Sequence, residues 1–233
     1  FPDAQVLLAR ARHPEQTLTF GVGFKGGHNA ELHNHNDIGS YYVMLDGVEM
    51  TGDPGGEVYT RRTFSKDRYV SKVLNSYGHP VPVVGGQLQR TGRAAAAKVL
   101  RASFTDAKDE VAIEYAAAYA VPALKSLVRT LAFDRVRNVL TVSDRIVCTA
   151  PTAFEVPVIT YRTWRKNAAA TAFTFDKSAT TQRKLEMTVA ASAPVRFREE
   201  RIENPSRPDV QRLAFAFEAP VTEATFTTTF SVR

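Results

Sequence analysis

The chain has 233 residues, of which 44% are hydrophobic and 23% charged, a composition typical of a folded protein that can bury a sizeable core. Thirty Lys and Arg against 24 Asp and Glu leave a formal charge of +6, which favours acidic partners without choosing among them. The basic residues are scattered, so no basic run indicates a nucleic-acid tail, and no apolar run approaches the roughly 20 residues that span a bilayer as a helix.

The sequence determines neither the redox compartment of the protein nor its targeting. Cys148 is the only cysteine, which excludes an intrachain disulfide, and its apolar neighbours predict a buried thiol on a strand. The chain begins at Phe1 without a Met, so we expect it to be a piece of a longer protein whose upstream sequence carried any targeting signal.

Short strands separated by turn residues dominate the chain. The first is predicted over 16–24, and 40–56 is typical of a hairpin that turns at Asp46-Gly47. Short helices are predicted over 94–99 and over 116–127, the second of which Pro122 interrupts. Further strands are predicted within 109–119, 127–147 (with a turn at Arg137-Asn138), 154–164, 168–176, 183–192, 195–202 and 213–233, and a long polar loop over 201–212.

Many of these segments alternate apolar and polar residues with period two, which buries one face of a strand and leaves the other wet. Amphipathic helices do not separate them. The sequence therefore predicts an all-β fold, a large antiparallel β-sandwich with one or two short helices, and a single domain over 1–233.

The stretch GGHNAELHNHNDIGSYYVMLDG, residues 26–47, holds three of the five histidines. A dinucleotide loop is one interpretation, because Gly21, Gly23 and Gly26 spell GxGxxG after a predicted strand. That loop must open a helix, whereas the residues that follow have no helical apolar period. The glycines are better explained by turns.

A metal site is the second interpretation. On an extended backbone His33 and His35 would point to the same side, and Asp53 and His79 lie in turn-like segments farther along. Two imidazoles and a carboxylate suit zinc better than calcium. A cupin would place an acid about four residues after the second histidine, where this chain has Gly39. The competing interpretation is that these are solvated polar loops.

Acid–base chemistry is the third interpretation. The two histidines could move protons. Tyrosines nearby in sequence could do so as well, although packing is the commoner role of tyrosine in β-rich sequence: Tyr41, Tyr42, Tyr59, Tyr69 and Tyr77. Three asparagines could orient the histidines or form turns, and turns are the default: Asn29, Asn34 and Asn36.

The segment 26–89 resembles the C-terminal domain of the heparinase II/III family of polysaccharide lyases. The resemblance rests on GGHNAELHNHNDIGSYYVMLDG, GDPGG and RYVSKVLNSYGHPVPVVGGQLQ, which occur in that order. It implies an antiparallel β-sandwich that accompanies an N-terminal helical toroid, absent from this chain, with an acidic sugar chain in the cleft between the two. It also implies β-elimination at a uronate, in which a base removes the C5 proton and an acid protonates the leaving oxygen.

The resemblance also assigns residues. It implies that His35, Asp53 and His79 bind zinc, that His33 is catalytic, and that Asn34, Tyr59 and Tyr69 contact the substrate. We expect the zinc to be structural, fixing the loops around His33.

The expected partners are an acidic polysaccharide and the missing helical domain, with no nucleic acid and no membrane span; a homo-oligomer is left open. The expected location is periplasmic or secreted, in a bacterium. Two rival functions remain: a non-catalytic carbohydrate-binding or structural module that retains the fold and metal, and a metal-dependent hydrolase or oxygenase. On the leading hypothesis the isolated domain binds zinc and shows little or no lyase turnover.

Overall fold

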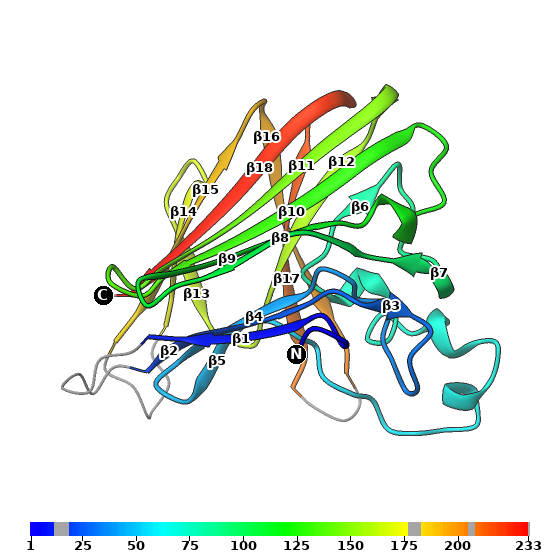
Figure 1. Ribbon diagram of the computed structural model, residues 1–233, viewed down its shortest axis with the longest axis horizontal. Coiled ribbons are helices and arrows are strands. Elements are labelled where there is room, and N and C mark those ends of the chain that lie inside the picture. Colours follow the sequence, from blue (N-terminus) through cyan, green and yellow to red (C-terminus); the bar gives the residue numbers. More distant parts are fainter. Residues whose placement is uncertain (12–18, 177–182, 205–207, 233) are drawn as a thin grey trace.

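The computed structural model describes residues 1–11, 19–176, 183–204 and 208–232, and antiparallel strands make up most of them (Figure 1). The largest sheet has eight strands in the order β13-β14-β15-β18-β11-β10-β9-β8. Their bounds are β8 Lys98–Phe104, β9 Lys108–Glu114, β10 Leu124–Asp134, β11 Val139–Thr152, β13 Trp164–Lys166, β14 Ala172–Phe175, β15 Leu185–Ala191 and β18 Val221–Val232. Along much of its long central strands β10, β11 and β18, buried residues alternate with half-buried ones, the period of two that the sequence pattern predicts.

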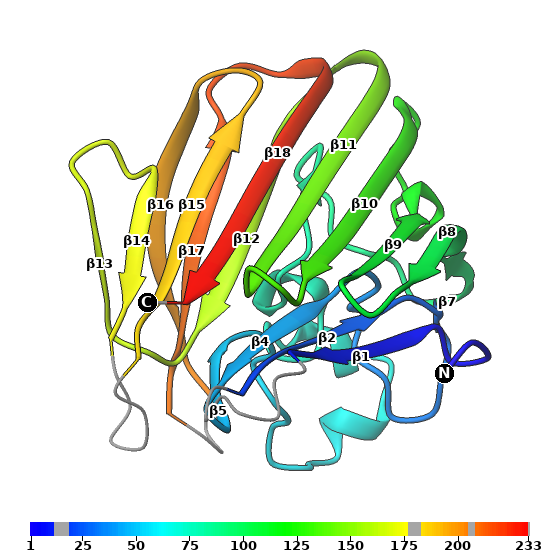
Figure 2. The ribbon, with the colours of Figure 1, turned by 60° about the vertical axis from the view of Figure 1, so that its left-hand side comes forward.

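Two four-stranded sheets lie against this large sheet, and Figure 2 shows them as the second layer of the sandwich. One has the order β1-β2-β4-β5, with β1 Val6–Arg10, β2 Phe20–Lys25, β4 Tyr41–Leu45 and β5 Val48–Thr51. The other has the order β16-β17-β12-β6, with β6 Val83–Val84, β12 Phe154–Thr160, β16 Val195–Ile202 and β17 Val210–Phe217. A two-stranded sheet pairs β3 His28–Asn29 with β7 Gly92–Ala96.

Aromatic contacts between the layers show that both smaller sheets pack on the large one. Phe215 of β17 contacts Phe226 of β18 with ring centroids 5.4 Å apart. Phe20 of β2 contacts Phe133 of β10 at 5.5 Å. All four side chains are buried in one continuous hydrophobic core, so the all-β sandwich predicted from the sequence is confirmed.

The tight turns fall where the sequence places them. Asp46 and Gly47 both have positive φ, at 50° and 77°, which is the conformation of a two-residue hairpin turn between β4 and β5. Asn138, also at positive φ, ends the turn between β10 and β11. Cys148 is buried on β11, as predicted.

Both helix predictions are corrected by the structure. Residues predicted as a helix over 94–99 belong to β7 and β8, because β-sheet pairing overrides the helix propensity of an alanine run. In 116–127 only Ala116–Ala118 (η4) is helical, and β10 begins at Leu124, just after Pro122. The other described helices are also single 3-10 turns: η1 Arg62–Phe64, η2 Arg68–Val70 and η3 Ser76–Gly78.

Three boundaries also differ from the sequence prediction. The strand predicted over 16–24 corresponds to β2, which begins at Phe20, and residues 16–18 of that prediction lie outside the described part of the chain; β1, which precedes it, was not predicted. Gly21 and Gly23 lie inside β2, which continues to Lys25, so the GxGxxG glycines do not open a helix. The predicted loop 201–212 is shorter, because β16 reaches Ile202 and β17 begins at Val210. Within the described ranges, no helix has the length and apolar character needed to cross a membrane.

The inter-sheet aromatic core should dominate stability. We expect Phe215→Ala to lower the free energy of unfolding by about 3–5 kcal/mol, because this fully buried ring leaves a cavity. Phe104→Ala, which removes a ring that is 59% exposed, is the matched control and should change it by less than about 0.5 kcal/mol. Chemical denaturation measures both, and equal losses would contradict the assignment of the core.

Candidate metal centre and its surroundings

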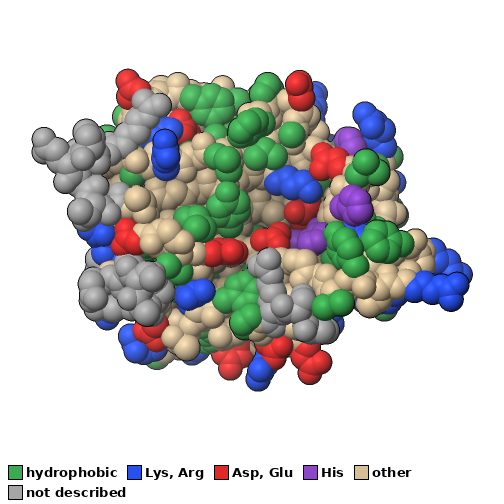
Figure 3. Space-filling view, turned by 90° about the horizontal axis from the view of Figure 1, so that it is seen from below, with side chains coloured by type: hydrophobic (Ala, Val, Ile, Leu, Met, Phe, Trp, Pro, Cys, Tyr) green, Lys and Arg blue, Asp and Glu red, His purple; other side chains and the backbone are tan. Residues whose placement is uncertain are grey.

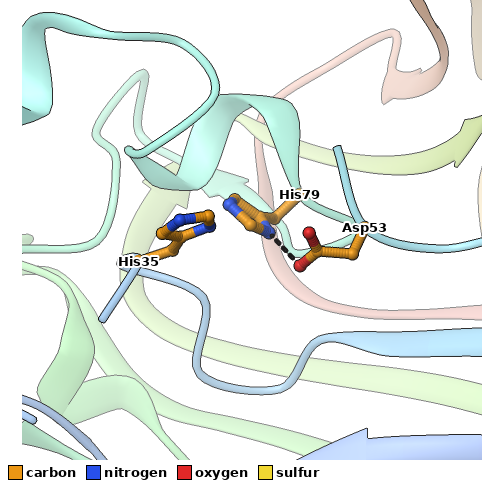
Figure 4. A group of neighbouring side chains, drawn as sticks. All are labelled: His35, Asp53 and His79. Atoms are coloured by element: carbon orange, nitrogen blue, oxygen red, sulfur yellow. Dashed lines mark ion pairs between the residues drawn. The ribbon is translucent and has the colours of Figure 1, made fainter. Parts of the chain in front are cut away.

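Three side chains from distant parts of the sequence meet beside the smaller sheets (Figure 4). His35 lies in the loop before β4, Asp53 follows β5, and His79 ends the 3-10 helix η3. One potential ligand atom from each lies within 4.8 Å of the others. The fold therefore brings together the three residues that the sequence analysis assigned to a metal.

The ring of His79 is oriented by its own loop. The Asn75 side chain accepts a hydrogen bond from the Tyr77 amide at 2.8 Å and so caps η3, which delivers His79 into the core with no exposed surface. Its Nε2 lies 3.0 Å from the Val73 carbonyl oxygen, which can only accept, so Nε2 carries a proton. The buried Nδ1 has no hydrogen-bond partner and lies 3.2 Å from Oδ2 of Asp53.

Asp53 is held by the turn that follows it. Its Oδ1 accepts a hydrogen bond from the Gly55 amide at 2.7 Å, and its own amide donates to Oε1 of Glu49 at 3.0 Å. The Asn204 side chain donates to the carbonyl oxygen of Pro54 at 3.0 Å and anchors the turn to the neighbouring sheet. Oδ2 is thereby left to face Nδ1 of His79 at 3.2 Å. Either a proton on Nδ1 or a cation held by both atoms satisfies this pair.

His33 and His35 separate because the backbone between them is not extended. His33 has φ of 59°, a left-handed conformation that costs a non-glycine residue about 1–3 kcal/mol. The His35 ring faces His79, with centroids 5.2 Å apart. The expected extended backbone at HxH is therefore wrong, since the chain turns at the first histidine.

The exposed His33 ring belongs to an aromatic cluster. It stacks on Tyr59 with centroids 6.2 Å apart and planes 13° apart, and it meets Phe64 edge-on, also at 6.2 Å. Tyr59 and Phe64 are 59% and 65% exposed, so the cluster faces solvent. Figure 3 shows histidine side chains beside hydrophobic ones on this face of the molecule.

The loop that carries His33 is tied to the segment of η2. Arg68 donates from Nη2 to the carbonyl oxygens of His33 and Asn34, at 3.2 and 3.1 Å. The hydroxyl of Tyr69 lies 3.1 Å from Oδ1 of Asn34, whose Nδ2 donates to the His35 carbonyl oxygen at 2.8 Å. Asn34 and Tyr69, both predicted to contact substrate, thus also fix the backbone that separates the two histidines.

The charges around the three candidate ligands shift their pKa values in different directions. Burial, followed by repulsion from His79, lowers the pKa of His35 to about 4. Burial alone would raise the pKa of Asp53, but His79 and His35 outweigh it and hold that pKa well below its usual range. Burial alone would lower the pKa of His79, but the Asp53 carboxylate outweighs it and raises that pKa. At neutral pH His35 is therefore uncharged and Asp53 is ionised, as metal ligands must be.

The remaining tyrosine candidates serve the fold. Tyr41 is buried in the core, and burial raises its pKa well above the usual range. The Tyr42 ring covers Gly23, where an added Cβ would come within 2.1 Å of it. Tyr77 donates a short hydrogen bond to Glu200 on β16.

Sequence reasoning missed two buried polar residues behind the metal centre. Gln89 donates from Nε2 to the Ile38 carbonyl oxygen at 2.7 Å and accepts from the Ile38 amide at 2.9 Å. Arg129 donates from Nη1 to the carbonyl oxygens of Gly39 and Pro80, each at 2.6 Å. A signal for Arg129 exists: it falls on the buried face of β10, among alternating apolar residues.

The donor set fits zinc. Two imidazoles and one carboxylate are the ligands of many zinc sites, and the convergence of one ligand atom from each residue, with the buried Nδ1 of His79 facing Oδ2 of Asp53, favours an ion here. His35, Asp53 and His79 would hold it, and the site has no thiolate. Zinc, when bound, would supply a fixed positive charge that joins three loops.

No family model matches the chain, and no curated protein matches its sequence. Solved structures do match its fold. A heparinase III structure has a TM-score of 0.79 at 11% identity, over 100% of this chain and 35% of that one. The heparan sulfate lyase HepC from Pedobacter heparinus has a TM-score of 0.78 at 14% identity, over 99% of this chain and 35% of that one. Another heparinase III structure has a TM-score of 0.71 at 13% identity, over 98% and 35%.

The predicted resemblance is thus confirmed for the fold, across the whole chain. The chain spans about a third, 35%, of the length of these solved structures. Identities of this size carry the fold alone.

Metal binding is directly measurable on this chain. We expect one zinc per chain, and we expect His79→Ala or Asp53→Ala to weaken binding by at least about 100-fold, because each removes a ligand. His28→Ala is the matched control, since His28 lies on β3 outside the centre, and should bind like the unaltered chain. Titration against a chromophoric chelator gives the affinities, and equal binding by all variants would contradict the site.

The pKa of His35 predicts a pH effect in metal-free protein. Between pH 6.5 and 4 the unfolded chain protonates His35 while the folded chain does not, so this group makes the free energy of unfolding fall as the pH falls. The raised pKa of His79 acts in the opposite sense, because its contribution to stability is lost as the pH rises, so it does not add to this decline. The free energy of unfolding of His35→Ala should therefore fall less steeply with falling pH than that of the unaltered chain. Chemical denaturation of chelator-treated protein at a series of pH values measures both. Identical slopes would refute the lowered pKa.

Proposed function

We propose that this chain is the β-sandwich domain of a lyase that cleaves uronic-acid-containing polysaccharide by β-elimination, supplying a zinc site and one wall of the substrate cleft. The observation that carries the proposal is the meeting of His35, Asp53 and His79 next to the exposed His33, in a chain with the fold of heparinase III over its whole length. Because the chain spans only about a third of those proteins, the catalytic cleft is completed by a further part of a longer protein.

β-Elimination requires a proton-transfer group that can contact the substrate. In β-elimination a base takes the C5 proton of the uronate, the bond from C4 to the glycosidic oxygen breaks, and the leaving oxygen receives a proton. His33 suits one of these transfers, because its ring is exposed while the backbone bonds from Arg68 hold its loop in place. Tyr59, stacked on it and exposed, is placed to contact the sugar.

Charge and shape around His33 suit an acidic sugar chain. The segment that carries Tyr59 and Phe64 also exposes Arg61 and Lys66, which attract uronate carboxylates. Aromatic side chains pack against the apolar face of a sugar ring, as they do with other ligands that present flat C–H surface. Heparan sulfate, the polymer named for one of the matching structures, is the first substrate to test.

His33→Ala in the full-length protein is the deciding variant. We expect it to lower the elimination rate by about 10²–10⁴-fold, because it removes a positioned proton-transfer group, while zinc content is unchanged. The measurement is the ultraviolet absorbance of the C4–C5 double bond released from heparan sulfate and other uronate polymers, with His28→Ala as control. Unaltered protein that binds these polymers without releasing unsaturated ends would favour a carbohydrate-binding module, and saturated products would favour a hydrolase.

A further inference from the structure

Arg129 is a charged residue in the middle of the hydrophobic core. It lies on β10 with none of its surface exposed. It forms a bidentate ion pair with Asp144 on β11, in which Nε donates to Oδ1 at 2.8 Å and Nη2 donates to Oδ2 at 2.7 Å. The hydroxyl of Tyr115 also donates to Oδ1 of Asp144, at 3.0 Å. This pair is therefore a rigid, fully hydrogen-bonded element of the large sheet.

The third nitrogen of the guanidinium, Nη1, contacts two loops outside the sheet. Nη1 donates to the carbonyl oxygen of Gly39 and to that of Pro80, both at 2.6 Å. Gly39 closes the loop that begins at His35, and Pro80 follows His79 directly. A single side chain thus binds the backbone next to His79 and the far end of the loop that carries His35.

The surroundings leave little room for either loop to move away from Arg129. Gly39 has φ of 90°, and an added Cβ would lie 3.3 Å from the Tyr115 ring and 3.8 Å from Nη1 of Arg129. Gln89 makes a second link between the two loops. Its side chain donates to the carbonyl oxygen of Ile38, and its backbone amide donates to the Ser76 hydroxyl at 2.9 Å. The loops before β4 and after η3 are held together from behind the metal centre.

We propose that Arg129 is a positioning residue for the metal centre, which fixes the spacing of His35 and His79 by holding Gly39 and Pro80 to the large sheet. This inference rests on the zinc site of the proposed function. Buried groups behind the ligands of a metal set its affinity by restricting ligand orientation. Here the restriction acts through the backbone, since Arg129 touches neither imidazole.

Only an arginine satisfies all four acceptors. Its planar fork presents five donors, so it can pair with both Asp144 oxygens and still bond two carbonyls. A lysine keeps the positive charge that Asp144 requires but has one nitrogen on a flexible stem. Arg129→Lys should therefore retain the buried ion pair and release at least one loop.

The test compares zinc affinity with stability in matched variants. Arg129→Lys should bind zinc about 10–100-fold more weakly than the unaltered chain, measured by competition with a chelator. Arg135→Lys is the control. Arg135, just after β10, makes a similar bidentate pair with Asp109 of β9 and donates to the Thr105 carbonyl oxygen at 2.8 Å, away from the candidate ligands. The thermal unfolding temperature of the metal-free protein should be lower in both variants. Zinc affinity should be lower only in Arg129→Lys.

A second variant and a spectroscopic readout keep the proposal testable if Arg129→Lys does not fold. The pair Arg129→Met with Asp144→Met removes both charges together, which avoids an unpaired buried charge. It should likewise lose zinc affinity, and its cobalt(II) complex should show altered visible absorption bands, because the ligand geometry relaxes. Wild-type affinity and cobalt spectra in either folded variant would overturn the proposal. Absence of zinc binding by the unaltered chain would instead refute the metal site itself.

Discussion

The buried ion pair between Arg129 and Asp144 is the constraint on which the functional face of this protein depends. Two charges in a core are costly to desolvate, and removing one partner would leave the other unpaired, at a cost of about 3–5 kcal/mol. The cost is offset only because every acceptor around the guanidinium is used: the two Asp144 oxygens and the carbonyls of Gly39 and Pro80. The large sheet is thereby joined to the loops that carry His35 and His79, two of the three residues of the candidate metal centre.

In this structure, one short stretch points its two histidines to opposite sides. The left-handed backbone at His33 turns its ring toward solvent and the aromatic neighbours, while His35 turns inward toward His79. Arg68 holds the carbonyls between them, so the local strain is compensated by hydrogen bonds outside the stretch. The candidate metal ligands thus lie on the inner side of the loop, and the outer histidine stays exposed.

The prediction of the fold succeeded where local rules decide. Alternation identified the long strands, and the residues Asp46, Gly47 and Asn138 marked turns because they tolerate positive φ. It failed over 94–99, where an alanine run favours helix in isolation but pairs as strand in the sheet. Arg129 was missed because an alternating pattern reports which face is buried without saying which partners a buried charge will find.

The sequence by itself determined the two-layered β class and the turns at Asp46-Gly47 and Asn138, since these follow from periodicity and turn conformation, and its motifs singled out the residues of the candidate metal centre. Tertiary structure alone decided that His35, Asp53 and His79 meet within 4.8 Å, that His33 stays outside, and that Arg129 stands behind them. The physical reason is that these contacts join segments far apart in the chain. Their distances are set by how the sheets pack, which no local pattern encodes.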